Sequence, residues 1–401
     1  MTVVASELTK WSQKITETVD ANKDLYIATS HDIHDHPEIG NEEHYASGLL
    51  TEILEKENFS VERAVAGHET SFLARKTSSK PGPVIGFLAE YDALPSIGHA
   101  CGHNIIGTLS VAAAIALSKV IEETGGELVV FGTPAEEGGP NGSAKGSFVK
   151  HGLLEGVDAC MMIHPSGKTS LTGSSLAVDP LDFEFIGKPS HAAASPHEGI
   201  NALDAVIQLF NGINALRQQL TDDVRIHGII THGGDAPNII PEYAKARFFI
   251  RAQTRSALNT VTQKVKAIAE GAALATGAEL NVIAFQNEVD NLLINNEFNQ
   301  LFKEVIEQFG ELVHDEKTGL GSTDAGNISQ VVPTIHPYIK IGPDDLVAHT
   351  EDFKTAARSP LGDEALLKGA KALAVTGLRL LTDTTLLTNI QEEFAKNESE
   401  N

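Results

Sequence analysis

Three short apolar runs in the first half of the chain constrain its fold more than any other feature. They cover residues 84–89, 128–131 and 159–163, and glycine, proline or charged residues bound each one. Between the first two runs lies an apolar stretch over residues 104–123, which predicts a helix that Gly125 and Gly126 stop. Short apolar strands that alternate with helices are typical of a buried parallel sheet. The sequence therefore predicts an α/β fold with a mostly parallel-sheet domain.

The length of 401 residues predicts a second domain, because one hydrophobic core seldom serves so long a chain. From about Asp179-Pro180 the patterns predict strand 181–186, helix 201–220, strands 224–231 and 243–251, helix 256–276 and strand 279–284. This β-α-β-β-α-β order is typical of a small two-layer α+β domain. We expect an inserted domain of residues 180–290 within a discontinuous domain of residues 1–179 and 291–401. The latter regains helices over 296–309 and 363–381, and the polar tail 391–401 is expected to fray.

Composition excludes several classes of function. The formal net charge of −24 argues against non-specific binding of nucleic acid, which requires clustered Lys and Arg. No apolar run reaches 18 residues, so we expect no membrane span. The N-terminus lacks the basic start and apolar stretch of a secretory signal, which makes the cytoplasm the expected location. Two cysteines, Cys101 and Cys160, predict no disulfide framework.

Residues that can bind metal follow strand-like runs at four places. Cys101 and His103 stand two positions apart ahead of the apolar helix, whose positive end favours a thiolate. Glu136 and Glu137 close the run 128–135, and the last two places are occupied by His164 and His349. Each residue alone is more simply a structural or surface side chain. Their shared position favours a site, since open α/β sheets bind ligands beyond the carboxyl ends of their strands.

This set of donors predicts metal chemistry. One thiolate, three imidazoles and one or two carboxylates exceed what a single tetrahedral zinc uses, and the mixture suits two divalent metals that share a ligand and a water. Such a water is acidified toward hydroxide, and the glutamate that is not a ligand can carry its proton to a leaving amine. Two rival hypotheses remain: a thiol hydrolase with Cys101 as its nucleophile, and a non-catalytic homologue that binds metal or a partner.

At the level of motifs, the chain resembles the aminoacylase and carboxypeptidase-G-type metallopeptidases, in particular the amidohydrolase branch with auxin-conjugate hydrolases, aminobenzoyl-glutamate hydrolase and β-alanyl-lysine dipeptidase-like proteins. The resemblance covers nearly the whole chain. The motifs that carry it lie at residues 34–40, 89–95, 98–104, 134–138, 190–193, 237–241 and 321–326. It implies a metal-dependent amidohydrolase or dipeptidase that hydrolyses a dipeptide or an N-acyl-amino acid. It also implies that the inserted domain is a lid through which a homodimer forms.

The resemblance also implies roles for individual residues. Two divalent ions, zinc or manganese with cobalt as a further candidate, would be held by Cys101, His103, Glu137, His164 and His349. Glu136 would be the general base, and His191 would steady the developing oxyanion in the active site of a partner subunit. Asn238 resembles a substrate contact of the family. From the residues themselves we also expect substrate contacts from Arg251, whose planar guanidinium can bind a carboxylate, and from Thr323 and Asp324, in a loop over residues 319–325. Asn104 replaces the Asp of many branch members, which we interpret as a mark of the β-alanyl-lysine dipeptidase-like subgroup.

Overall fold

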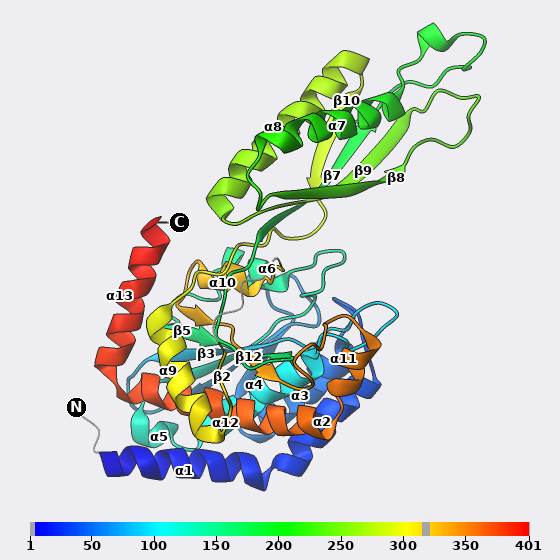
Figure 1. Ribbon diagram of the computed structural model, residues 1–401. Helices are drawn as coiled ribbons and strands as arrows, with labels where there is room; N and C mark the ends of the chain where they lie inside the picture. Colours follow the sequence, from blue (N-terminus) through cyan, green and yellow to red (C-terminus); the bar gives the residue numbers. More distant parts are fainter. Residues whose placement is uncertain (1–4, 315–320, 401) are drawn as a thin grey trace. The chain divides into compact units, whose positions relative to one another are not determined.

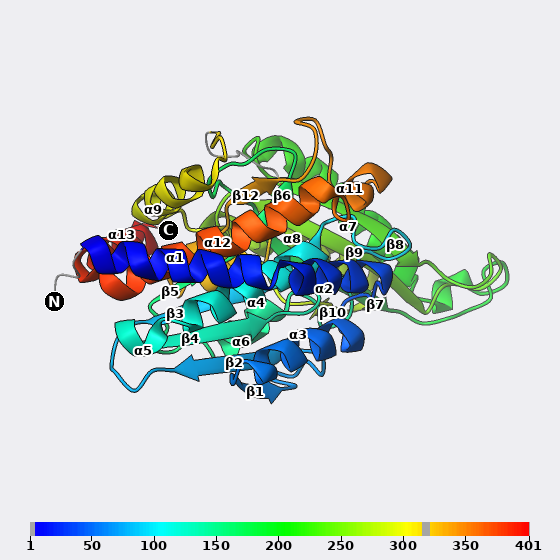
Figure 2. The ribbon, with the colours of Figure 1, turned by 90° about the horizontal axis from the view of Figure 1, so that it is seen from below.

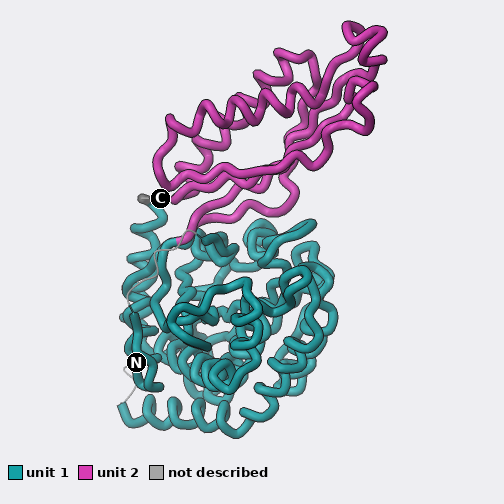
Figure 3. Tube along the Cα trace, turned by 45° about the vertical axis from the view of Figure 1, so that its right-hand side comes forward, with its two compact units in different colours: residues 1–174, 292–400 teal, residues 175–291, 401 magenta. Residues whose placement is uncertain are grey.

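The computed structural model describes residues 5–314 and 321–400, and this part of the chain forms two compact units (Figures 1 and 3). Unit 1 comprises residues 1–174 and 292–400, and unit 2 comprises residues 175–291. None of the helices in the described residues is long and apolar enough to cross a membrane.

Unit 1 is built on a six-stranded sheet with the strand order β1-β2-β4-β3-β5-β11. Strand β3 runs parallel to β4 and β5, and β5 runs parallel to β11, whereas β2 is antiparallel to both β1 and β4. The mostly parallel sheet predicted from the sequence is confirmed. Its strands are β1 (Ser60–Arg63), β2 (Phe72–Thr77), β3 (Val84–Ala89), β4 (Glu127–Gly132), β5 (Ala159–Met161) and β11 (Thr334–Ile335), and β6 (His164–Ser166) and β12 (Tyr338–Lys340) form a separate parallel pair.

Helices cover both faces of this sheet because its central strands are apolar on both sides. Phe87 and Val130 pack into one core with Leu109 and Leu373, and the alternate residue Leu88 packs on the other face. Figure 2 shows the first face, where α1 and α12 run beside each other over α4. The helices of unit 1 are α1 (Ala5–Ala21), α2 (Lys23–Asp35), α3 (His44–Lys56), α4 (His103–Ser118), α5 (Ile121–Thr124), α6 (Ala144–Lys150), α9 (Asn296–Ile306), α10 (Ala325–Ser329), α11 (Glu351–Ala356), α12 (Pro360–Thr382) and α13 (Thr384–Glu400).

Two sequence predictions for unit 1 were wrong. The helix expected over residues 104–123 is two helices, because α4 ends at Ser118, whose hydroxyl donates back to the Ile115 carbonyl. Of the tail expected to fray, residues 391–400 belong to helix α13, and residue 401 lies outside the described residues. Polar residues of α13 bind α9: the Glu393 carboxylate accepts hydrogen bonds from the backbone N–H groups of Asn296 and Glu297. These N–H groups at a helix N-terminus have no partner within the helix, so a carboxylate there is stabilising.

Unit 2 has the predicted β-α-β-β-α-β order. Its four strands form an antiparallel sheet in the order β10-β7-β9-β8, and α7 and α8 pack on it in a separate core that includes Phe183, Leu209 and Val265. The elements are β7 (Ala177–Ile186), α7 (Ala202–Leu216), β8 (Arg225–His232), β9 (Tyr243–Ala252), α8 (Arg255–Thr276) and β10 (Glu279–Ala284). Strand β8 lies at the edge of the sheet and exposes Ile229 and Ile230, by 63% and 45% respectively.

Candidate metal centre and active site

The loop that carries Cys101 and His103 turns sharply at two glycines. Gly98 and Gly102 have φ angles of 74° and 79°, a left-handed conformation that glycine adopts without steric cost. A Cβ on Gly102 would lie 2.8 Å from the ring of Pro165, so this glycine also permits the close approach of the two segments. The Cys101 Sγ atom consequently lies 3.5 Å from Nε2 of His164.

The two glutamates follow β4 after a turn at Ala135, and an oxygen of each carboxylate lies 3.9 Å from Nε2 of His103. Ala135 has a φ of 58°, which is unusual for a residue with a Cβ. Glu137 lies with its Oε1 3.4 Å from Nε2 of His349, and Glu136 lies 3.9 Å from Nε2 of His103 through its Oε2. His349 also has a left-handed φ, of 64°, and its backbone N–H donates to Ala100, which ties it to the Cys101 loop.

The predicted donors come together in unit 1. Cys101 belongs to one compact group with His103 and His164 and to another with Glu137 and His349; within each, the donor atoms lie within 4.8 Å of one another. A third such group holds His103, Glu136 and Glu137. Nε2 of His103 is buried and has no hydrogen-bond partner in the described part of the chain. A thiolate, imidazoles and carboxylates in such groups suit divalent metals, and Cys101 lies where two of the groups meet.

Asp92 positions His103 and Glu137 through hydrogen bonds, and no specific function was predicted for it from the sequence. Its Oδ1 lies 2.8 Å from Nδ1 of His103, and its Oδ2 accepts a hydrogen bond of 2.9 Å from the backbone N–H of Glu137. A carboxylate on Nδ1 fixes the tautomer that leaves Nε2 free to bind a metal. Burial lowers the pKa of His103, but Asp92 and Cys101 outweigh it and raise that pKa well above its ordinary value.

Burial and nearby charge set the protonation of the other groups. Burial, together with Glu90 and Glu137, raises the pKa of the Glu136 carboxyl well above its ordinary value, which suits a group that takes and returns a proton. Burial and Glu137 likewise raise the pKa of the Cys101 thiol. Burial lowers the pKa of His164 to about 3 and keeps its imidazole neutral.

A buried ammonium group lies beside Glu136. Lys145, on α6, is fully buried, and its Nζ lies 2.7 Å from Glu90 and 2.5 Å from Asp324. Burial lowers the pKa of Lys145, but these two carboxylates together raise it above its ordinary value. Carboxylate oxygens of Glu90, Glu136 and Asp324 form a fourth compact group of donors, and the Lys145 ammonium neutralises part of the charge of this group.

Two predicted substrate residues of unit 1 lie in surroundings unlike those expected. Asp324 is buried and binds both Nζ and the backbone N–H of Lys145, so its carboxylate is engaged inside the protein. Thr323 is also buried, and its Oγ1 accepts a hydrogen bond from the Ala325 backbone. Residues 319 and 320 of the predicted loop lie outside the described residues. Thr323 and Asp324 lead directly into helix α10, which packs against α6, the helix that carries Lys145.

Asn104 ties together three segments of unit 1. Its Nδ2 donates to the hydroxyl and carbonyl oxygens of Ser30 and to the carbonyl oxygen of Ala357, over distances of 2.9 to 3.3 Å. The amide therefore joins the first turn of α4 to α2 and to the end of α11. A carboxylate at this position would have no hydrogen to donate.

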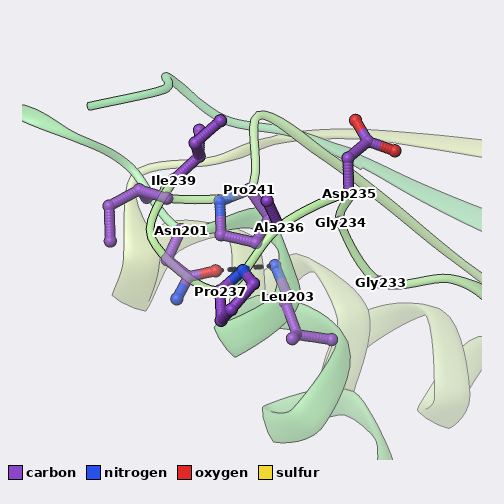
Figure 4. Close-up of a pocket in the computed structure, with 10 residues that line it drawn as sticks. Asn201, Leu203, Gly233, Gly234, Asp235, Ala236, Pro237, Ile239 and Pro241 are labelled. Carbon is purple, nitrogen blue, oxygen red and sulfur yellow. Dashed lines mark hydrogen bonds between the residues drawn. The ribbon is translucent and has the colours of Figure 1, made fainter. Parts of the chain in front are cut away.

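The remaining predicted residues belong to unit 2. His191 and Asn238 are exposed and lie on adjacent turns, since the Ala192 backbone N–H donates to the Asn238 carbonyl. Arg251 is half-buried on β9, with its guanidinium over the Phe249 ring. Beside the turn of Asn238, a pocket of about 370 Å³ is visible in Figure 4. It is lined by Asn201, Leu203, Gly233, Gly234, Asp235, Ala236, Pro237, Ile239, Ile240 and Pro241.

The fold and the donor groups define a metallohydrolase, and comparison with known proteins identifies its family. Residues 86–377 match the model of peptidase family M20/M25/M40, so the chain belongs to this family and is a metallopeptidase-type enzyme. It is 37% identical to the Xaa-Arg dipeptidase of Mus musculus, over 97% of this chain and 93% of that protein. It is 29% identical to a p-aminobenzoyl-glutamate hydrolase subunit of Escherichia coli, over 94% of each chain.

Solved structures share the fold at lower sequence identity. The aminobenzoyl-glutamate utilization protein of Klebsiella pneumoniae is 19% identical, with a TM-score of 0.69 over 88% of this chain and 98% of that chain. A dinuclear metal binding peptidase of family M20 from Bacillus subtilis is 21% identical, with a TM-score of 0.63 over 89% of this chain and 99% of that chain. Family membership and the donor groups support the use of divalent metal.

Proposed function

We propose that this protein is a two-metal dipeptidase. The observation that carries the proposal is the position of Cys101, which belongs to two separate groups of three donors, with Glu136 beside them. Two cations would be held by Cys101 and by the donors predicted from the sequence, which are His103, Glu137, His164 and His349. The thiolate and imidazoles suit zinc, whereas the carboxylate also suits manganese or cobalt.

When bound, the cations acidify a water and polarise the carbonyl of the scissile amide bond. Glu136 takes the proton from the attacking water and delivers it to the leaving amine. Its raised pKa, caused by burial and by Glu90 and Glu137, suits this double task. We assign His191 to the carbonyl oxygen of a substrate bound to a partner copy, where an imidazole N–H would stabilise the charge that develops there. Asn238 and Arg251 are proposed to bind the substrate's carbonyl or carboxylate.

The proposed substrate is a dipeptide with a C-terminal arginine or a similar cationic residue. The support is the 37% identity with the Xaa-Arg dipeptidase of Mus musculus over nearly the full length of both chains. An N-acyl-amino acid is the second candidate, because the p-aminobenzoyl-glutamate hydrolase chain of Escherichia coli is 29% identical over a similar span. The thiol hydrolase is disfavoured, since a cysteine nucleophile would leave the Glu136–Glu137 pair and His349, which lie close to Cys101, without a role.

We propose further that the protein acts as a homodimer in the cytoplasm, with unit 2 supplying the interface. Strand β8 is the edge of an antiparallel sheet, along which a second β8 can pair through its backbone, and it exposes Ile229 on one face and Ile230 on the other. Sedimentation velocity would test this assignment. Ile229→Lys should give a monomer, whereas Leu274→Lys, on the exposed surface of α8, should leave a dimer intact. A wild-type monomer at micromolar concentration would refute the dimer.

The decisive experiment combines metal analysis with hydrolysis. Protein purified without chelator should carry about two divalent ions per chain, measured by plasma mass spectrometry, and should hydrolyse alanyl-arginine faster than N-acetyl-arginine. Removal of metal should abolish turnover, and the added ion should restore it. Glu136→Gln should retain the metal and lose nearly all turnover. Turnover that survives complete metal removal would overturn the proposal, and would favour Cys101 as a nucleophile if alkylation then abolished it.

A further inference from the structure

The turn that leads into Glu136 and Glu137 depends on a strained residue. Ala135 has a φ of 58°, a left-handed conformation that is unfavourable for a residue with a Cβ and persists only where neighbours enforce it. Two backbone hydrogen bonds close the turn on its carbonyl side, from Ser143 at 2.7 Å and from Gly138 at 3.3 Å. The N–H of Ala135 points away from these partners and needs one of its own.

Glu43 provides that partner from a distant part of the chain. Its Oε1 accepts a hydrogen bond of 2.9 Å from the Ala135 N–H, and its Oε2 accepts one of 2.7 Å from the Thr70 hydroxyl. The Glu43 side chain is fully buried at the start of α3. Losing this acceptor would leave a buried N–H without a partner.

The same segment packs directly on the turn. A Cβ on Gly40 would lie 2.7 Å from the Gly138 carbonyl oxygen and 2.8 Å from the Ala135 side chain, so residues 40–43 touch the turn through backbone and side chain. On the other side, Asp92 holds the Glu137 N–H. Two carboxylates thus bind the turn: Glu43 accepts the N–H of Ala135, and Asp92 accepts the N–H of Glu137.

We propose that Glu43 is a positioning residue for this site: by holding Ala135 in its left-handed conformation, it aims Glu136 and Glu137 at their separate tasks. Glu43 lies 3 positions beyond Gly40 and 92 positions before Ala135, so the sequence pattern alone does not relate it to the glutamates. This inference rests on the proposed function, because it assumes that Glu137 binds metal and that Glu136 carries the proton.

Four variants test the proposal. Glu43→Gln keeps a carbonyl oxygen for the Ala135 N–H and should keep kcat within about threefold of the wild type. Glu43→Leu removes the acceptor, and Glu43→Asp withdraws it by one methylene while remaining the safer variant to fold. Both should lower kcat on alanyl-arginine at least tenfold, about 1.4 kcal/mol, with KM changed less than threefold. Glu38→Leu is the matched control, since Glu38 accepts the N–H groups of Tyr45 and Ala46 on the same helix without touching the turn.

A second readout does not depend on turnover. Metal affinity, measured by competition with a chelator, should fall at least about tenfold in Glu43→Asp and Glu43→Leu, and should be unchanged in Glu43→Gln and Glu38→Leu. If Glu43→Asp matches Glu43→Gln in kcat and metal affinity, or loses no more than Glu38→Leu, the positioning role is refuted while the dipeptidase proposal stands. A wild-type protein that neither binds metal nor hydrolyses dipeptides would instead refute the proposed function.

Discussion

Replacing Lys145 with methionine should strongly destabilise unit 1. The lysine Nζ lies 2.7 Å from Glu90 and 2.5 Å from Asp324, and all three side chains are buried. At an effective dielectric constant of about 20, Coulomb's law gives roughly 6 kcal/mol for each such pair. The desolvation of the buried charges offsets much of this attraction. The net loss on removing one partner of a buried ion pair is about 3–5 kcal/mol, because uncompensated charges stay behind.

Urea unfolding of the metal-free protein would measure this loss. Trp11, the only tryptophan of the sequence, lies buried on α1 and therefore reports on unit 1 by fluorescence. With a urea m-value of about 3 kcal/mol per molar, the midpoint of Lys145→Met should fall by about 1 M or more. Lys396→Met, on the exposed surface of α13, is the control and should stay within about 0.5 kcal/mol of the wild type.

A triple variant distinguishes the loss of the ion pairs from the loss of packing around Lys145. The variant that combines Lys145→Met with Glu90→Gln and Asp324→Asn removes the lysine together with its two ion-pair partners, so much of the lost stability should return. If Lys145→Met unfolds at the same urea concentration as Lys396→Met, the reasoning is refuted. If Glu90→Gln and Asp324→Asn instead destabilise the Lys145→Met protein further, each by as much as it destabilises the wild type, the charges do not act as one group.

Three further changes have defined outcomes. Asn104→Asp should lower the free energy of unfolding by about 2–3 kcal/mol, measured in urea, because a carboxylate would face the carbonyl oxygens of Ser30 and Ala357; unchanged stability would contradict this. Burial and Asp92 raise the pKa of Glu43 to about 7, so folding takes up a proton and the contribution of Glu43 to stability falls as pH rises from about 4.5 to 7. In Glu43→Gln the free energy of unfolding should decline over this pH range by up to about 3 kcal/mol less than in the wild type. Parallel pH profiles of the two proteins would contradict this. His191→Ala should lower kcat about a hundredfold with metal content unchanged, as assayed on alanyl-arginine, and full activity would exclude the oxyanion role.

The sequence predicted the elements of the fold because its hydrophobic patterns are strong. The runs that form β3, β4 and β5 are apolar throughout, and the alternation in unit 2 gave the order of all six elements. Strands β1 and β2 were not predicted, because Arg63, Arg75 and Lys76 interrupt any apolar pattern in strands at the antiparallel side of the sheet. Helix α13 was missed because its stability comes from contacts with the start of α9 and with Ile294 just before it, which a polar local sequence does not reveal.

The candidate site was predicted only in part, for a physical reason. Donors such as Cys101 and His164 stand at the ends of strand-like runs, where an α/β sheet collects them. Lys145 and Glu43 gave no comparable signal. Their importance arises from burial and from partners that lie far away in the sequence, such as Asp324 for Lys145 and Ala135 for Glu43. The motif at residues 89–95 contained Glu90 and Asp92, and two acids directly after a buried strand were the one available indication.

The discontinuous build of unit 1 has a consequence for its synthesis on the ribosome. Helix α4 is buried along nearly its whole length, and α12 is one of the helices that cover it. Strand β5 likewise pairs with β11, and the Cys101 loop is hydrogen-bonded to His349, both of which are synthesised much later. Unit 2 is made from one continuous segment and can fold while these partners are still untranslated. We therefore expect the emerging N-terminal half to expose an apolar helix until residues 360–382 leave the exit tunnel, which makes it a substrate for chaperones that bind nascent chains.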